Sequence, residues 1–449
     1  MDDQKTFSFV GLRKPANIWT GLSFLINMNC SFEQPKVING ITKYGGVKED
    51  SKACPINNVI GNMFENTHVM LGQYNISTNT NNVIVNEAIS RISTDSDLIR
   101  TIGFNSGVFP DTSDPDVWDK DLNGGLLKRE KFWCHPSTSQ PDADGLLPLK
   151  VVNLCGYLQT SCHNIPNPIP SEFECFLRLT KYNDEILITN YDEADNTKYR
   201  LNIKSIEIGL PRGTMEPKMQ EQIERLWTNT NPLTYIFNRT EVTQFVINKD
   251  LRSFITPELF RSFDIPPLFM VICQSQARSS GDYHKSIHKY EQFNFTNKIF
   301  IPTFRFELPG GDKLESMCLT LNNSNFYKCF STKQTTVQTG LLKHLYRFSL
   351  DNIGSNGQLS PSLQEEDFAS WSFSPVFRCT PLPPNTLNFK DDMPDIVLPK
   401  IKVGTYRLEF KFSAPTTEVQ NLFVISFKPS LMEIFKNRSI ATSFYGLIN

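Results

Sequence analysis

Regular alternation of apolar and polar side chains near the end of the chain places the strongest constraint on its fold. Between residues 405 and 412 every second residue is apolar: Tyr406, Leu408, Phe410 and Phe412. A period of two places the two kinds of side chain on opposite faces of an extended chain, so this segment predicts a half-buried β-strand. Pro415 lacks the N–H group that a strand ladder needs, and the apolar run at 422–427 predicts a second strand that lies deeper.

The same alternation recurs in both halves of the chain, and long helices are few. Segment 172–182 places four residues on one face: Phe173, Cys175, Leu177 and Leu179. Further strands are predicted at 18–30, 199–210, 240–250, 266–275, 300–319 and 345–351. Helical spacing predicts short helices within 54–64 and 85–103. Many strands joined by long connections rich in Asn, Ser and Pro favour sandwiches of the jelly-roll kind over a βαβ sheet.

The length of the chain predicts two domains. At 449 residues the chain is longer than one domain, which typically has ~100 to 200 residues. Hydrophobic residues make up 39% of the chain and include 34 Phe, which is enough to build sizeable cores. We therefore predict an all-β chain with two jelly-roll β-sandwich barrels side by side and short helices in the connections. The first would span 1–210, with a long polar loop insertion near 105–150. A linking helix and the second barrel would span 211–449, with surface loops at 352–395.

The clearest helix lies at the predicted domain boundary, in residues 214–227. Its apolar stripe consists of Met215, Met219, Ile223, Leu226 and Trp227, and Thr214 is available as an N-cap. We expect this stripe to be buried against its own barrel. The alternative is a surface that docks a partner, since Met and aromatic residues are common at interfaces.

Two other tryptophans, Trp118 and Trp133, stand in or beside sequence typical of loops. An exposed indole ring needs a partner to cover it, so both are candidates for contact between subunits. The candidate subunit contacts are therefore Trp118, Trp133, Met219, Ile223 and Trp227.

The net charge and the distribution of charged residues indicate which kinds of partner are not predicted. The net charge is −2 and Lys and Arg are scattered, so no site for nucleic acid or for an anionic membrane is predicted. The N-terminus does not have the pattern of a signal peptide, and the longest apolar run, 268–273, is too short to span a bilayer. Ten cysteines without a repeated spacing predict reduced thiols in the cytosol or nucleus.

No catalytic, cofactor or metal site is predicted. His284 and His288 have helical spacing without a third ligand, and we interpret them as part of a polar loop. Cys134-His135 and Cys162-His163, with Cys155 between them, leave a structural zinc site as the less favoured alternative, because the pairs do not follow C-x2-C spacing. The glycine pairs at 45–46 and 310–311 lack the lysine of a phosphate loop and are interpreted as turns.

The end of the chain resembles a known family. Residues 403–440 combine an alternating strand, an A-x-P turn, an apolar strand and a closing segment from Ile434 to Arg438. They resemble the C-terminal end of the double jelly-roll major capsid proteins of Polinton (Maverick) and adintovirus-like elements, which are of the hexon type. Residues 253–301, 345–351 and 206–226 look like further segments of that family. In the first half the resemblance is limited to the order of the elements.

The resemblance implies a structural protein without an active site. Three subunits with two sandwiches each would form a pseudo-hexameric homotrimer, and trimers would tile an icosahedral shell together with penton or minor capsid proteins. It also implies a place in the virion capsid after assembly inside the host cell, in the nucleus or cytoplasm, and it leaves contact with a membrane open. A receptor- or carbohydrate-binding β-sandwich or minor capsid protein is the alternative, and a β-sandwich hydrolase or cupin-like metal enzyme is a third hypothesis.

Overall fold

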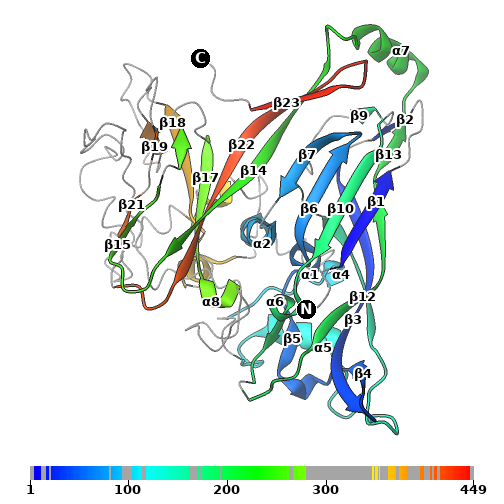
Figure 1. The fold of residues 1–449 in the computed structure, drawn as a ribbon, viewed down its shortest axis with the longest axis vertical. Helices are drawn as coiled ribbons and strands as arrows, with labels where there is room; N and C mark the ends of the chain where they lie inside the picture. The colour runs from blue at the N-terminus through cyan, green and yellow to red at the C-terminus, as the bar shows by residue number, and fades with distance from the viewer. Residues whose placement is uncertain are drawn as a thin grey trace.

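β-Sheet accounts for most of the regular structure. The computed structural model describes residues 5–11, 17–19, 22–79, 82–93, 104–113, 118–158, 160, 169–170, 173–192, 194–257, 259–261, 266–279, 346–347, 349–351, 353, 363–370, 374–381, 395–398, 405–406, 409–411 and 415–444. Figure 1 shows two groups of strands side by side, with helix α2 (Asn82–Ser93) between them. This helix, the longest one described, has 12 residues.

Two four-stranded sheets form most of the first half. One has the order β1-β10-β6-β7, with β1 at Thr6–Gly11, β10 at Cys175–Lys181, β6 at Phe64–Leu71 and β7 at Tyr74–Asn79. In the other, β3 (Phe24–Ile38) pairs with β12 (Arg200–Gly209) along one edge, and with β8 (Val151–Leu158) and β4 (Ile41–Gly46) along the other edge. Short strands complete this half: β2 (Asn17–Trp19), β5 (Ala53–Pro55), β9 (Ile169–Pro170), β11 (Ile188–Asn190) and β13 (Arg212–Thr214).

The predicted alternation of strand faces is confirmed in the first half. The side chains of Phe173, Cys175, Leu177 and Leu179 are all buried. In β12, Leu201 and Ile203 are buried, and the register with β3 then shifts by one residue between Ile203 and Ser205. This bulge adds Lys204 to the strand, so Ile206 and Ile208 return to the inner face instead of turning outward.

One large sheet dominates the second half. Its order is β14-β22-β17-β18-β19, and β23 also pairs with β22. The strands span Leu233–Ile247 (β14), Gln420–Ile434 (β22), Leu268–Ser275 (β17), Val376–Pro381 (β18), Asp395–Leu398 (β19) and Ile440–Phe444 (β23). Two smaller pairs lie apart from it: β15 (Ser253–Ile255) with β21 (Glu409–Lys411), and β16 (Phe260–Arg261) with β20 (Thr405–Tyr406).

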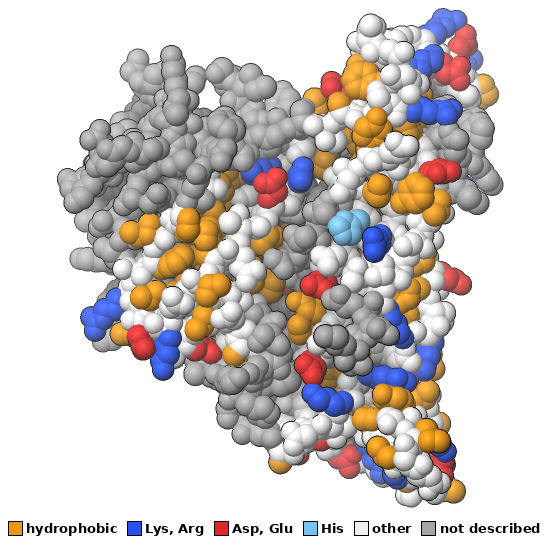
Figure 2. All heavy atoms as spheres, in the orientation of Figure 1, with side chains coloured by type: hydrophobic (Ala, Val, Ile, Leu, Met, Phe, Trp, Pro, Cys, Tyr) orange, Lys and Arg blue, Asp and Glu red, His pale blue; other side chains and the backbone are white. Residues whose placement is uncertain are grey.

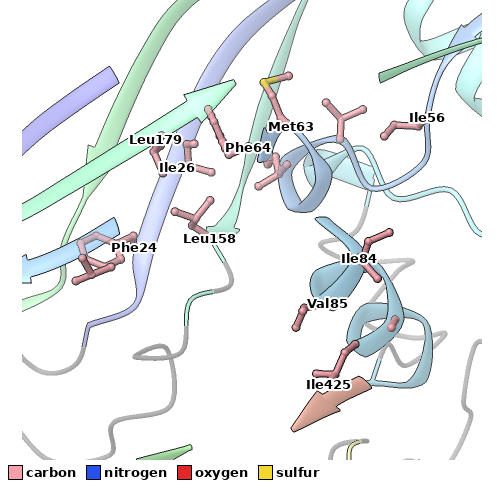
Figure 3. Packing of buried hydrophobic residues seen from close by; sticks show 14 of the residues in the cluster. Phe24, Ile26, Ile56, Met63, Phe64, Ile84, Val85, Leu158, Leu179 and Ile425 are labelled. Carbon is pink, nitrogen blue, oxygen red and sulfur yellow. The ribbon is translucent and has the colours of Figure 1, made fainter. Parts of the chain in front are cut away.

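Strand β22 is buried on both faces, as its nearly continuous apolar run predicted. Every side chain from Gln420 to Lys428 is buried. Successive side chains of a strand point to opposite faces, so Val424 and Ile425 belong to different layers of the core. Figure 3 shows Ile425 beside Ile84 and Val85 of α2, a helix from the first half. The apolar side of α2 therefore packs between the two groups of strands and joins them in one core.

The remaining helices are short. They are α1 (Val59–Asn62), α4 (Phe104–Ser106), α5 (Gly124–Trp133), α6 (Asp184–Leu187), α7 (Pro217–Leu226), α8 (Gln276–Ser279), α10 (Glu365–Ser370) and the 3-10 turn η1 (Glu49–Ser51). The helices predicted within 54–64, 85–103 and 214–227 are present as α1, α2 and α7. No helix of the described part of the chain is long and apolar enough to cross a membrane.

Two predictions in the second half are wrong. Segment 345–351 was expected to be a strand, but its described residues are helical, because Tyr346, Leu350 and Ile353 also recur at the spacing of a helix and face the core. The stretch 352–395 was expected to consist of surface loops, yet it contains α10 and the buried start of β18. The strand pattern at 300–319 lies outside the described residues.

Candidate subunit interface

Helix α7 lies at one end of the molecule, beyond the ends of the neighbouring strands (Figure 1). It begins at Pro217, whose fixed backbone angle suits the first helical position. The predicted N-cap, Thr214, is wrong: it belongs to β13, and Glu216 takes the N-cap position without a capping hydrogen bond from its side chain. Arg225 and Glu221 pair at 2.6 Å along the exposed surface. Figure 2 shows basic and acidic side chains together over this helix.

The expectation that the apolar stripe of α7 is buried against its own barrel is confirmed for Trp227 and wrong for Met219 and Leu226. Met219 is 55% exposed and Leu226 is 65% exposed, while Ile223 is partly buried against the core. The stripe is exposed because α7 extends past the sheets, where its own chain offers little surface to cover it. Exposed apolar side chains of this size are typical of a surface that binds a partner.

Trp227 fixes the C-terminal end of α7 to the second half. Its side chain is buried, and the indole Nε1 donates a hydrogen bond of 2.8 Å to the backbone oxygen of Ile434, the last residue of β22. Lys436 donates to the backbone oxygen of Glu224 at 3.1 Å, so the turn after β22 also holds the helix. Trp227 is therefore an anchor within the subunit, and Met219 and Leu226 remain accessible.

The two other candidate tryptophans lie near α5, at a distance from α7 along the molecule. The expectation that Trp133 is exposed is wrong: its side chain is fully buried, with its ring edge-on to Phe132 at 5.4 Å. The polar residues around it suggested a loop, whereas helix α5 turns this residue inward. Trp118 is partly buried, with its ring centroid 4.5 Å from that of Tyr191. The candidate contacts do not form one patch.

The polar segment near 105–150 is more ordered than a surface loop. Asn123 caps α5 by accepting hydrogen bonds from the backbone of Gly125 (3.1 Å) and Leu126 (3.2 Å). The buried guanidinium of Arg129 pairs with Asp111 at 2.8 Å. Burial raises the pKa of Glu130, although the nearby Lys120 ammonium partly offsets the effect. The acidic and Asn residues that suggested a loop thus cap helix α5 and form ion pairs with it.

A surface that the sequence reasoning missed covers the outer side of β8, β3 and β12. Nine residues in three rows form it, and we name it the amide face: Tyr157, Leu25 and Gly209; Cys155, Asn27 and Glu207; Asn153, Asn29 and Ser205. Asn153 donates to Asn27 at 2.8 Å and to Asn29 at 3.1 Å, and Asn29 donates to Ser205 at 2.8 Å. The signal in the sequence was Asn at every second position of an apolar strand.

A charged cluster around Glu33, within β3, bounds this face. Glu33 is fully buried and accepts from Arg200 at 2.6 Å and from Lys204 at 2.8 Å. Burial would raise the pKa of Glu33, but hydrogen bonds from Lys204, Ser31 and Arg200 outweigh it and lower the pKa to about 2. The Arg200 guanidinium also lies 3.2 Å from the ring centroid of Tyr44. This arrangement connects β3, β12 and β4 through one buried carboxylate and its basic partners.

The cysteine and histidine residues considered as zinc ligands are spread over different partners. Cys134 is buried 3.9 Å from the backbone oxygen of Ala53, and His135 lies 2.8 Å from the backbone oxygen of Pro148. Within the described residues, no group of three or more His, Cys, Asp or Glu side chains could hold a metal ion. Burial raises the pKa of Cys30, Cys54, Cys175 and Cys273 to about 12. His284, His288, Cys162 and His163 lie outside the described residues.

The chain was compared with known proteins by sequence and by fold. No family model matches the sequence, and no curated protein matches it. The fold is similar to the mavirus major capsid protein, with a TM-score of 0.50 and 10% identity over 98% of this chain and 87% of that chain. A chain of the Sputnik virophage structure gives a TM-score of 0.54 and 10% identity, over 100% of this chain and 87% of that chain. The Faustovirus major capsid protein gives a TM-score of 0.51 and 6% identity, over 95% of this chain and 87% of that chain.

These likenesses cover nearly the whole chain at identities of 10% or less, and therefore concern the fold. The predicted fold class is confirmed, and so is the resemblance to double jelly-roll major capsid proteins at the level of the fold. This chain has the double jelly-roll fold.

Proposed function

We propose that this chain is a major capsid protein, and that three copies form a pseudo-hexameric block that tiles an icosahedral virus shell. The likeness in fold to the mavirus and Faustovirus major capsid proteins, over 95% or more of the chain, carries the proposal. Two sandwiches in each of three subunits give six similar units around one axis, which suits a hexagonal lattice. The role would be structural and not catalytic, with penton or minor capsid proteins as further partners.

A division into two jelly-roll domains near the predicted boundary of 210/211 belongs to this proposal. In support, the described strands from β1 to β13 pair only with one another, and those from β14 to β23 pair only with one another. Each half also pairs an early 15-residue strand with its last long strand, as β3 with β12 and β14 with β22. Because β13 pairs with β2, we put the boundary a few residues later, between Thr214 and Leu233, with α7 as the link.

Contacts between subunits would include the exposed side of α7. Met219 and Ile223 of the predicted set qualify, because one is exposed and the other is only partly buried. Trp118, which is partly buried beside Tyr191, remains a candidate. Assembly would take place inside the host cell, and the mature location would be the virion capsid.

Light scattering of the purified chain tests this function. We expect a particle of about three times the 51.3 kDa mass of one chain, and larger assemblies at high concentration. A single chain at every concentration tested would contradict the proposal. Binding of the monomer to a glycan array in that case would favour the receptor- or carbohydrate-binding alternative.

A further inference from the structure

An Asn-Gly pair forms the turn between β3 and β4. Ile38 pairs with Ile41, so Asn39 and Gly40 are the two residues of the turn. Both have a positive φ, 52° for Asn39 and 77° for Gly40, as a two-residue hairpin turn of type I′ requires. Both residues are exposed, and β4 lies at the end of the molecule opposite α7 (Figure 1). The turn is therefore accessible to water.

The two groups of this turn that can react with each other are unrestrained. Among the described residues, neither the Asn39 carboxamide nor the backbone N–H of Gly40 has a hydrogen-bond partner. A Cβ atom at Gly40 would meet no atom within 4 Å. The neighbouring Val37 and Ile41 are 68% and 66% exposed, so little packing holds the tip of the hairpin closed. Local opening of such a tip has a low cost in free energy.

We infer that Asn39 is a site of spontaneous deamidation, which the chain carries out on itself. The backbone nitrogen of Gly40 attacks Cγ of the Asn39 carboxamide, and glycine has no Cβ atom that would hinder the approach. The new N–C bond closes a five-membered succinimide ring, and the Cγ–Nδ2 bond breaks. The side-chain nitrogen leaves as ammonia with the proton of the Gly40 amide. Water then adds to either ring carbonyl and opens the ring to aspartate or isoaspartate.

A second Asn-Gly pair of the described chain provides the contrast. Asn123 is fully buried, its Oδ1 accepts hydrogen bonds from the backbone of α5, and its Nδ2 donates to Asp111 at 2.9 Å. The N–H of Gly124, the corresponding nucleophile, donates to the Thr112 hydroxyl at 2.9 Å. Both reacting groups are thus held in place. The same dipeptide is reactive at the hairpin tip and protected at the start of α5.

The two products change the tip in different ways. Aspartate places a negative charge next to the exposed Val37 and Ile41. Isoaspartate lengthens the main chain, so the two-residue turn no longer matches the register of β3 and β4. The cores of the sandwiches lie away from this tip, and we expect the modified chain to stay folded. The inference depends on local structure alone and is independent of the proposed function.

Peptide mapping by mass spectrometry tests the inference on the folded full-length chain, incubated at mildly alkaline pH. We expect Asn39 to be converted at least about ten times faster than Asn123, because only the tip opens easily. In concentrated urea the two rates should become similar, since the protection of Asn123 is lost and an aliphatic residue precedes each pair. Asn356-Gly357 lies outside the described residues, and its peptide is followed separately.

The variant Asn39→Gly is the matched control, because Gly-Gly also forms turns of type I′. It should keep the thermal midpoint of the wild type and show no conversion in this peptide. Isoaspartate forms only through the ring, so its appearance at position 39 supports the attack by the Gly40 nitrogen. Equal rates at Asn39 and Asn123 in the folded chain would overturn the inference. Aspartate without isoaspartate would overturn the part assigned to Gly40.

Discussion

Gly125 shows how close packing at a single residue limits which substitutions the first half can tolerate. A Cβ atom at this position would lie 2.1 Å from the backbone oxygen of Pro110, too close for the two segments to remain in place. At the adjacent Gly124, the nearest atom would be the Thr112 hydroxyl oxygen at 3.8 Å, an ordinary contact distance. Two neighbouring glycines at the start of α5 therefore have different roles.

Substitution of these glycines by alanine should separate the roles. We expect Gly125→Ala to destabilise the chain by roughly 1–3 kcal/mol, because α5 must move away from Pro110. Gly124→Ala should be neutral or stabilising by up to about 1 kcal/mol, since it removes freedom from the unfolded chain without a clash. Urea denaturation measures both free energies of unfolding. Equal losses for the two variants would show that the close approach to Pro110 is absent.

Glu33 should make the stability of the chain depend on pH in the acid range. Its pKa in the folded state is about 2, below the usual value of 4.5, so the folded chain favours the charged carboxylate. The stabilisation is complete above pH 4.5 and is lost as the pH falls toward 2. Its size is on the order of 2–3 kcal/mol.

The variant Glu33→Gln tests this account. It should lose most of that stabilisation at neutral pH and show a flatter decline in the thermal midpoint between pH 4.5 and 2. Glu185→Gln is the matched control, because Glu185 pairs with Lys198 at 2.7 Å on the exposed surface, where an ion pair contributes at most about 1 kcal/mol. Parallel pH profiles for the wild type and Glu33→Gln would contradict the role of this carboxylate.

Among the elements, α7 has exposed apolar side chains, and Trp227 attaches its C-terminal end to β22. We expect Trp227→Phe to keep a smaller aromatic ring at this position and to remove the hydrogen bond to Ile434, which leaves a buried carbonyl oxygen with one donor fewer. The loss should be about 1–2 kcal/mol. Hydrogen exchange should become faster in α7 and at the end of β22, and stay unchanged in β6 and β10. Uniform exchange rates across the chain would show that Trp227 does not anchor the helix.

The elements also show what could be predicted from the sequence. Strands such as β10 and β22 were predictable because burial on one face leaves a period of two and burial on both faces leaves an apolar run. Residues 346–353 were misjudged because their apolar positions fit both a strand and a helix, and only the tertiary contacts decide between them.

The candidate contacts were harder to predict than the strands. Whether Trp133 or Met219 is exposed depends on what lies opposite each of them, and a pattern along one segment does not contain that information. The stripe of α7 has the periodicity of a buried helix, yet it extends beyond the sheets that would cover it. The amide face escaped notice because its three strands lie far apart in the sequence.

At the scale of the whole molecule, the apolar side of α2 packs between the two groups of strands, so both groups share one core. Such a block leaves its outer sheet faces and α7 for contact with other copies. The shared core holds the two groups of strands together within one chain.

Electron microscopy of the purified, negatively stained protein tests this account most directly. We predict class averages with threefold symmetry and a nearly hexagonal outline made of six similar densities, two from each chain. Particles the size of one chain, or assemblies without a threefold axis, would contradict it.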